Sequence, residues 1–249
     1  MNPEALRAHR QLVRRSHYIN NTATRYSLKR MHKISAGILS WLTTLLIPIV
    51  LLGLALRVLL TPLFLQIEYR LPYFPPDEYG FSTTDRLHYA PYALHYLLND
   101  EDISYLGDLT FADGEALFNP RELSHMQDVR GVTLGSLRLW YTTLVIVGML
   151  AVWSRLGKWW QVFLRGLKRG GWLTVSLVLA VGLFAAMAFW QFFTIFHSLF
   201  FEGDSWLFLY SDTLIRLFPI RFWQDVFLDA ALIAAGGGLA IGLGLKPKV

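Results

Sequence analysis

Four long apolar segments dominate the 249-residue sequence and constrain what it can fold into. Each is long enough to cross the hydrocarbon core of a bilayer, which takes about 20 helical residues. The segments run approximately over residues 34–65, 134–153, 172–193 and 226–245. Charged residues make up 16% of the chain, against roughly 25% in soluble domains. We therefore expect an all-α membrane protein with four transmembrane helices.

Two of these segments contain residues that disturb a regular helix. Pro48 and Pro62 lie in the first, so we expect a kink or an early exit there. Gly236, Gly237 and Gly238 lie in the fourth, where they either loosen the helix or let a neighbouring helix approach closely. We expect no cleavable signal peptide, because the first apolar run begins more than thirty residues into the chain and is too long for one.

The distribution of charge predicts how the segments are oriented. Residues 1–33 carry eight Lys or Arg and one acidic residue, and residues 154–171 carry five and none. Residues 66–133 carry four basic and twelve acidic residues, and residues 194–225 carry two and four. Basic flanks stay in the cytoplasm. We therefore expect both termini and the 154–171 connection to be cytoplasmic, and the other two loops to be extracytoplasmic.

The same counts divide the chain into two regions. Residues 1–33 are expected to form a basic cytoplasmic tail, and residues 34–249 a four-helix transmembrane domain with a small extracytoplasmic headpiece inserted at 66–133.

A net charge of +5 could suggest nucleic-acid binding, but the basic residues lie beside apolar segments, where membrane orientation explains them. Cysteine is absent, which excludes disulfides, thiolate metal sites and cysteine nucleophiles.

The headpiece is expected to combine helices with a short hairpin. The stretch STTD at residues 82–85 predicts a capped helix start. Residues 105–118, YLGDLTFADGEALF, alternate apolar and polar side chains around a turn, which predicts a hairpin. Asn119 before Pro120 predicts a new helix, because Asn caps helices and Pro is favoured at their first position. That helix is expected to continue into the second span.

This last helix carries an ionisable stripe. Glu122, His125 and Asp128 recur at intervals of three and so share one helix face. A carboxylate can fix the tautomer of a histidine and raise its pKa, as a general base requires. A solvated helix stabilised by such pairs is the alternative interpretation. Glu122 and Asp128 are therefore candidate orienting groups for His125, and Arg130 is a candidate ligand for polar groups of lipid or peptide.

A second histidine lies in the other extracytoplasmic loop. His197 occurs in FFTIFHSLFF, residues 192–201, directly after the third span. An aromatic setting at the interface removes water from the imidazole and favours its neutral form. An aromatic belt explains the phenylalanines well and the histidine less well. Because ionisable groups at membrane depth are costly and tend to be functional, we pair His125 with His197 as candidate catalytic residues.

Three segments also resemble a known family: LFNPRELSHMQDV, FHSLFFEGDSWLF and DTLIRLFP, which precede the second span, follow the third and precede the fourth. The chain is similar to the DUF1461 integral membrane family, which includes the lipoprotein intramolecular transacylase of bacteria, over about residues 34–245. The resemblance implies an acyltransferase of the bacterial cytoplasmic membrane. It would move the sn-2 acyl chain of a diacylglyceryl-cysteine to the α-amino group, giving a lyso-form lipoprotein. The two catalytic histidines of the family correspond to His125 and His197.

The resemblance further implies diacylglyceryl-modified lipoproteins and membrane lipid as partners, without a metal or cofactor. Two other classes stay open. One is a metal-dependent membrane hydrolase, because carboxylate and imidazole groups bind zinc. Its ligands would be Glu122, His125, Asp128 and His197. The other is a non-enzymatic scaffold or transporter component. The main charges within the spans, Arg57, Arg138 and Asp229, lie near enough to helix ends to snorkel.

Overall fold

The computed structural model describes residues 35–248, so the basic tail expected at residues 1–33 lies outside the described residues. Within that range four helices are long and apolar enough to cross a membrane, by length and composition. They are a first helix at Ser35–Leu59, α5 (Pro120–Leu156), α6 (Trp160–Met187) and α9 (Ile220–Gly244). The predicted class, an all-α membrane protein with four spans, is confirmed.

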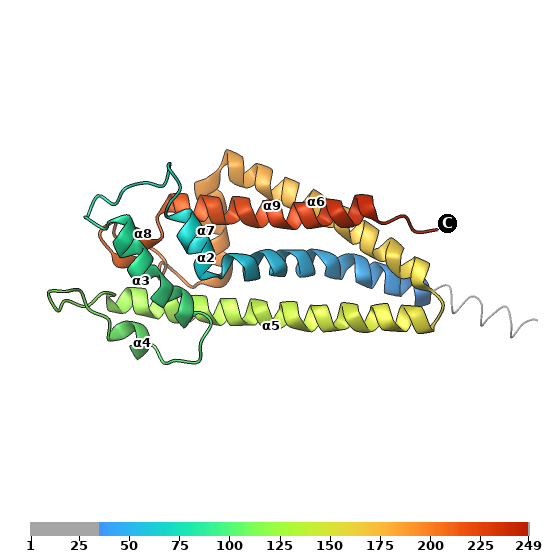
Figure 1. Ribbon diagram of the computed structural model, residues 1–249, viewed down its shortest axis with the longest axis horizontal. Coiled ribbons are helices and arrows are strands. Elements are labelled where there is room, and N and C mark those ends of the chain that lie inside the picture. The colour runs from blue at the N-terminus through green and yellow to red at the C-terminus, as the bar shows by residue number, and fades with distance from the viewer. Residues whose placement is uncertain (1–34, 249) are drawn as a thin grey trace, which may run out of the picture.

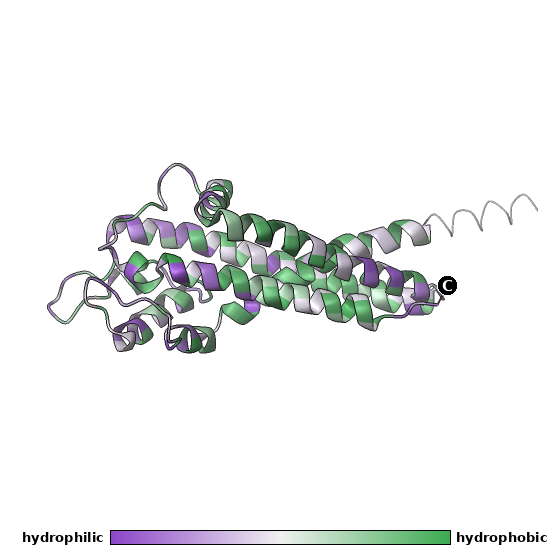
Figure 2. Ribbon diagram, turned by 90° about the horizontal axis from the view of Figure 1, so that it is seen from above, coloured by the Kyte–Doolittle hydropathy of each residue, from purple (hydrophilic) through white to green (hydrophobic). Residues whose placement is uncertain are grey.

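The long helices run lengthwise beside one another, and the shorter helices gather at one end of them (Figure 1). The C-terminus lies at the opposite end. Hydrophobic residues follow the middle of the long helices, whereas hydrophilic residues concentrate toward both ends (Figure 2). Many large apolar side chains along these helices are exposed, including Leu139, Val145 and Met149 of α5. Such a surface is stable in lipid and unfavourable in water.

The first span ends just before Pro62, one of the two prolines at which a kink or an early exit was expected. The helix continues through Pro48 to Leu59, and α2 (Pro62–Glu68) then begins with Pro62 at its first position. The Thr61 hydroxyl caps α2 by accepting a hydrogen bond from the Phe64 amide. Pro62 therefore marks the early exit, because proline at a first helical position needs no amide partner.

Glycines let α6 and α9 pack backbone to backbone. A Cβ atom added to Gly238 would lie 2.7 Å from the Gly171 carbonyl oxygen, and one added to Gly171 would lie 2.6 Å from the Gly238 carbonyl oxygen. Gly237 faces the side chain of Leu51 in the first helix. Close approach is thus the role of this glycine run in the structure, as small residues commonly allow between membrane helices.

The headpiece begins with a helix that is capped as the sequence predicted. The Ser82 hydroxyl accepts from the Asp85 amide, and the Asp85 carboxylate accepts from the Ser82 amide, so α3 (Thr83–Tyr96) starts with a capping box. After the short α4 (Ser104–Gly107), one antiparallel bridge joins Thr110 and Ala116. Among the described residues this bridge is not extended into a strand. The predicted hairpin is therefore reduced to a single tight turn.

The second loop completes the headpiece core. Leu214 and Leu217 belong to α8 (Thr213–Leu217) and are buried with α2, α3 and the start of α5. The buried guanidinium of Arg86 in α3 donates to the carbonyl oxygen of Arg216, and the Arg216 side chain pairs with Asp77 at 3.0 Å. Residues 66–133 and the loop before α9 therefore fold as one unit.

Candidate active site

The helix that carries His125 begins outside the apolar span. Asn119 caps α5 by accepting from the amides of Arg121 and Glu122, as Asn before Pro120 predicted. The helix is continuous for 37 residues. At about 1.5 Å per residue it is about 55 Å long, against a hydrocarbon core of about 30 Å. Its first turns therefore extend into the headpiece, and His125 lies in the second of them.

His197 reaches the same place through a break in the third span. The predicted span at residues 172–193 is not one helix, because α6 ends at Met187 and Ala188 has non-helical angles (φ −147°, ψ 59°). The next helix, α7 (Phe189–Phe200), turns across the headpiece end of the bundle (Figure 1). Phe192 of α7 packs against Phe227 of α9 at 4.8 Å between ring centroids. These aromatic contacts hold α7 across the bundle and bring His197 toward α5.

The structure brings the two histidines together. The ring centroids of His125 and His197 are 6.4 Å apart, and the ring planes lie 20° from parallel. The residues are 9% and 8% exposed, so both imidazoles are largely removed from water. Among the described residues no hydrogen bond joins the two rings. Two polar groups held side by side in this way can act on one substrate group.

Aromatic side chains surround the pair. The centroid of the His125 ring lies 4.9 Å from the ring centroid of Phe201 and 5.3 Å from that of Phe208. His197 lies 4.1 Å from the Phe193 ring and 4.6 Å from the Trp206 ring. The phenylalanines of α7 were expected from the sequence, whereas Trp206 and Phe208 were not predicted as part of the site. Their position in FHSLFFEGDSWLF, directly after His197, was the available signal.

The backbone fixes the tautomer of His197. Its Nδ1 lies 2.8 Å from the carbonyl oxygen of Phe193. A carbonyl oxygen only accepts, so Nδ1 carries the hydrogen and Nε2 of the neutral ring keeps its lone pair. Burial lowers the pKa of His197 below its ordinary value of 6.5, partly opposed by this hydrogen bond. Nε2 is therefore the nitrogen of the neutral ring that can accept a proton.

His125 differs from its partner in its hydrogen bonding. Its Nδ1 is buried and has no hydrogen-bond partner among residues 35–248. A buried polar atom without a partner is unusual in a folded protein, and such atoms concentrate at sites where a ligand or substrate completes the bonding. His125 therefore retains unused hydrogen-bonding capacity at Nδ1.

The two carboxylates of the ionisable stripe do not contact His125 in the way the spacing predicted. The buried Glu122 carboxylate accepts from the Leu214 amide at 2.6 Å and from the Asn119 amide at 2.8 Å. Asp128 is exposed and makes no hydrogen bond or ion pair within the described part of the chain. Glu122 instead fastens the start of α8 to the start of α5, and so fixes the loop that carries Phe208.

Arg130 also makes its contacts with protein. Its guanidinium donates to the carbonyl oxygens of Asn99 and Glu101, and lies 4.8 Å from the centre of the Tyr96 ring. These contacts tie α5 to the end of α3. The side chain thus holds the headpiece against the helix that carries His125.

A polar cavity adjoins the histidine pair. It measures about 380 Å³ and is lined by Asn119, Arg121, Asp204, Leu207, Phe208, Leu209 and Asp212. Arg121 pairs with Asp204 at 3.1 Å across it. The Asp212 carboxylate accepts from the Asn119 side chain at 3.1 Å and from the Leu209 amide at 2.8 Å. Because Phe208 contacts His125, the cavity opens beside the pair.

The four ligands considered for a metal-dependent hydrolase are not gathered around one point. No group of three or more His, Cys, Asp or Glu side chains within residues 35–248 is arranged to hold a metal ion. Glu122 points to backbone amides and Asp128 to the exposed surface.

A buried histidine pair at one end of four membrane-length helices defines an integral membrane protein with a candidate active site in its headpiece. The sequence model of the lipoprotein intramolecular transacylase Lit matches residues 40–223. The chain belongs to this family, and the family resemblance expected from the sequence is confirmed.

Similar proteins cover most of the chain. An uncharacterized protein of Aquifex aeolicus (strain VF5) is 27% identical over 208 residues, which are 82% of this chain and 91% of that protein. The solved structure of the membrane-integral transacylase Lit from Bacillus cereus has a TM-score of 0.70 at 20% identity, covering 84% of this chain and 93% of the other. The structure of a histidine variant of that protein has a TM-score of 0.66 at 18% identity, covering 87% of this chain and 92% of the other. These structures share the fold described here.

Proposed function

We propose that this protein is a lipoprotein intramolecular transacylase that uses His125 and His197 to move an acyl chain from oxygen to nitrogen. The substrate is a lipoprotein with a diacylglyceryl group on its N-terminal cysteine. The observation that carries the proposal is the buried, stacked histidine pair, built from two separate helices in a chain of the transacylase family. The family supports the reaction class, and the geometry supports the choice of these two residues.

The reaction is an ester aminolysis within one molecule. The cysteine α-amino nitrogen forms a bond to the carbonyl carbon of the sn-2 ester, and the bond from that carbon to the glyceryl oxygen breaks. The nitrogen loses a proton, and the glyceryl oxygen gains one. Holding amine and ester in register turns the reaction into a unimolecular step, which removes a large entropic part of the barrier.

The two histidines have different roles in this proposal. His197 is the base, because its bond to Phe193 leaves Nε2 free to take the proton of the attacking amine. His125 stands beside it with an unpartnered Nδ1 and donates to the developing oxyanion or the departing glyceryl oxygen. Phe201 and Phe208 keep water from the ester, which favours transfer to the amine over hydrolysis.

The substrate would approach from two sides. Its acyl chains come from the lipid that surrounds the long helices, and its peptide lies in the polar cavity beside Phe208. Charge counting supports an extracytoplasmic headpiece and cytoplasmic termini in a bacterial cell. The site would then face the leaflet in which mature lipoproteins are anchored. Lipoprotein and membrane lipid are the partners that this arrangement requires.

Purified protein and a synthetic diacylglyceryl-cysteinyl peptide would test the proposal by tandem mass spectrometry. Transfer leaves the total mass unchanged and converts one glyceryl ester to an amide on the α-amino nitrogen, so that fragmentation leaves one acyl chain on nitrogen when the glyceryl group is lost. Hydrolysis would instead lower the mass by one acyl chain, and a non-enzymatic scaffold would leave the peptide unaltered. Either of these two results would refute the transacylase.

A further inference from the structure

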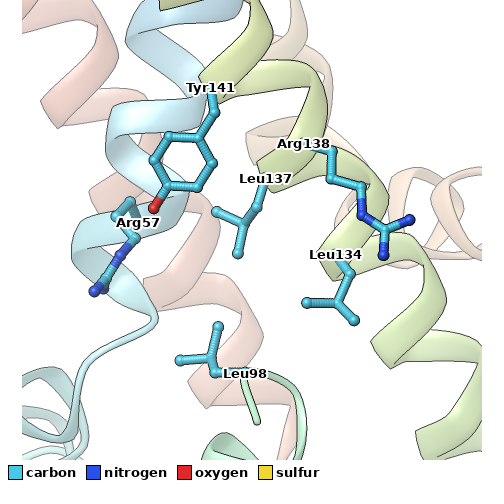
Figure 3. Close-up of a pocket in the computed structure, with 6 residues that line it drawn as sticks. All are labelled: Arg57, Leu98, Leu134, Leu137, Arg138 and Tyr141. Atoms are coloured by element: carbon cyan, nitrogen blue, oxygen red, sulfur yellow. The ribbon is translucent and has the colours of Figure 1, made fainter. Parts of the chain in front are cut away.

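A second cavity lies between the first helix, α5 and the end of α3. It measures about 310 Å³ and is lined by Arg57, Leu98, Leu134, Leu137, Arg138 and Tyr141 (Figure 3). Arg138 follows His125 by thirteen residues, which places it about 140° round the helix and about 20 Å along it. The cavity is therefore separate from the histidine site.

The two arginines of this cavity have no acidic partner among the described residues. Arg57 donates to the carbonyl oxygen of Leu60 at 3.4 Å, which uses one of its five donors. Arg138 makes no hydrogen bond or ion pair within residues 35–248. The lining of the cavity includes no carboxylate. Nearly all the donors of two guanidinium groups are thus available to a ligand.

The position of these charges calls for contact with the interface or with an anionic group. Both residues belong to helices of membrane length, Ser35–Leu59 and Pro120–Leu156. Arginine within a span is tolerated where it reaches the interface or an anionic partner. Figure 3 shows the two side chains on opposite sides of the leucines, and Leu98, which follows the headpiece helix α3, lines the cavity with them. The cavity therefore adjoins the depth at which lipid headgroups begin.

The rest of the lining is suited to a lipid chain. Leu98, Leu134 and Leu137 line the space between the two arginines (Figure 3). Tyr141 adds an aromatic ring with a hydroxyl, a combination typical of membrane interfaces. Guanidinium groups bind phosphate through paired, charge-assisted hydrogen bonds. Cationic flanks around an apolar floor match a molecule with a phosphate joined to acyl chains.

We propose that this cavity binds a membrane phospholipid of the leaflet at the headpiece end. The headgroup lies between Arg57 and Arg138, which flank the cavity from opposite sides and donate hydrogen bonds to its oxygens, and an acyl chain lies against Leu134 and Leu137. The site is independent of the proposed transacylase reaction, because the diacylglyceryl-cysteine of that substrate carries no phosphate. The bound lipid would join the first helix to α5 below the headpiece.

Native mass spectrometry of the delipidated full-length protein can test this site. Phosphatidylglycerol is titrated in, and diacylglycerol serves as the probe that lacks phosphate. We expect saturable binding of one tight phosphatidylglycerol, weakened about tenfold by Arg138→Gln alone and further by Arg57→Gln with it. Arg70→Gln is the matched control, because Arg70 is exposed and donates to the Gln66 carbonyl oxygen without lining the cavity.

Three results would overturn the proposal. They are equal binding of phosphatidylglycerol by the wild type and the double variant, equal binding of phosphatidylglycerol and diacylglycerol, and displacement of the lipid by millimolar inorganic phosphate. Size-exclusion profiles check that each variant is folded. If the double variant does not fold, Arg138→Lys keeps the charge and loses the paired geometry, so it should bind the lipid between the wild type and Arg138→Gln.

Discussion

The imidazole rings of His125 and His197 stack at 6.4 Å between centroids, although they belong to different helices and different loops of the chain. The two residues are unequal within this pair. His197 is held by the Phe193 carbonyl, whereas Nδ1 of His125 has no partner among the described residues. This asymmetry assigns the base to His197 in the proposed reaction.

The first prediction concerns the protonation of His197. An imidazolium cannot accept a proton, so the base must be neutral. Because burial lowers its pKa, the ring of His197 should take up its proton with a midpoint below pH 6.5. Nitrogen NMR of histidine-labelled protein measures the titration directly, with assignment from the His197→Ala variant. A midpoint at or above pH 6.5 would exclude this environment for the ring.

The second prediction separates the two carboxylates of the ionisable stripe. Glu122→Gln replaces an acceptor of two backbone hydrogen bonds by a group that can accept only one of them. We expect a loss of about 1–3 kcal/mol in the free energy of unfolding, with a fall in activity as the loop near Phe208 loosens. Asp128→Asn should change neither, because Asp128 is exposed and unpaired among the described residues. Equal effects of the two variants on thermal unfolding would contradict the structure.

The third prediction concerns the contact between α6 and α9. Gly238→Ala would push a methyl group against the Gly171 carbonyl oxygen, and we expect it to destabilise the protein by about 1–3 kcal/mol. Gly236→Ala is the matched control, since a Cβ there meets no atom within 4 Å. That variant should be neutral or slightly stabilising, because alanine favours a helix more than glycine does. Thermal unfolding in detergent measures both effects. We expect a lower unfolding temperature for Gly238→Ala than for Gly236→Ala.

Local signals in the sequence predicted the elements that depend on local chemistry. The caps at Ser82 and Asn119 and the exit at Pro62 follow from side chains adjacent to the backbone groups they serve. The four spans follow from their length. The break at Ala188 was not predicted, because no glycine or proline marks it and it depends on contacts with α9.

The site shows the same division. Periodicity placed Glu122 and His125 on one helix face, but it could not show that the Asn119 and Leu214 amides occupy the carboxylate. The Leu214 amide belongs to a distant part of the chain, so only the folded structure reveals this contact. The pairing of His125 with His197 was expected from their common side of the membrane, and their distance and stacking are findings of the structure.

Mass spectrometry of lipoprotein N-termini tests the central claim most directly. A host that lacks other N-acylating activity would express the wild type, His125→Ala or His197→Ala, with membrane insertion checked by immunoblot. The wild type should convert diacylglyceryl-cysteine to N-acyl lyso-form lipoprotein, and each variant should lose about 10²–10⁴-fold of that activity, as expected for a general acid or base. Full conversion by either variant, or none by the wild type, would contradict the two-histidine transacylase.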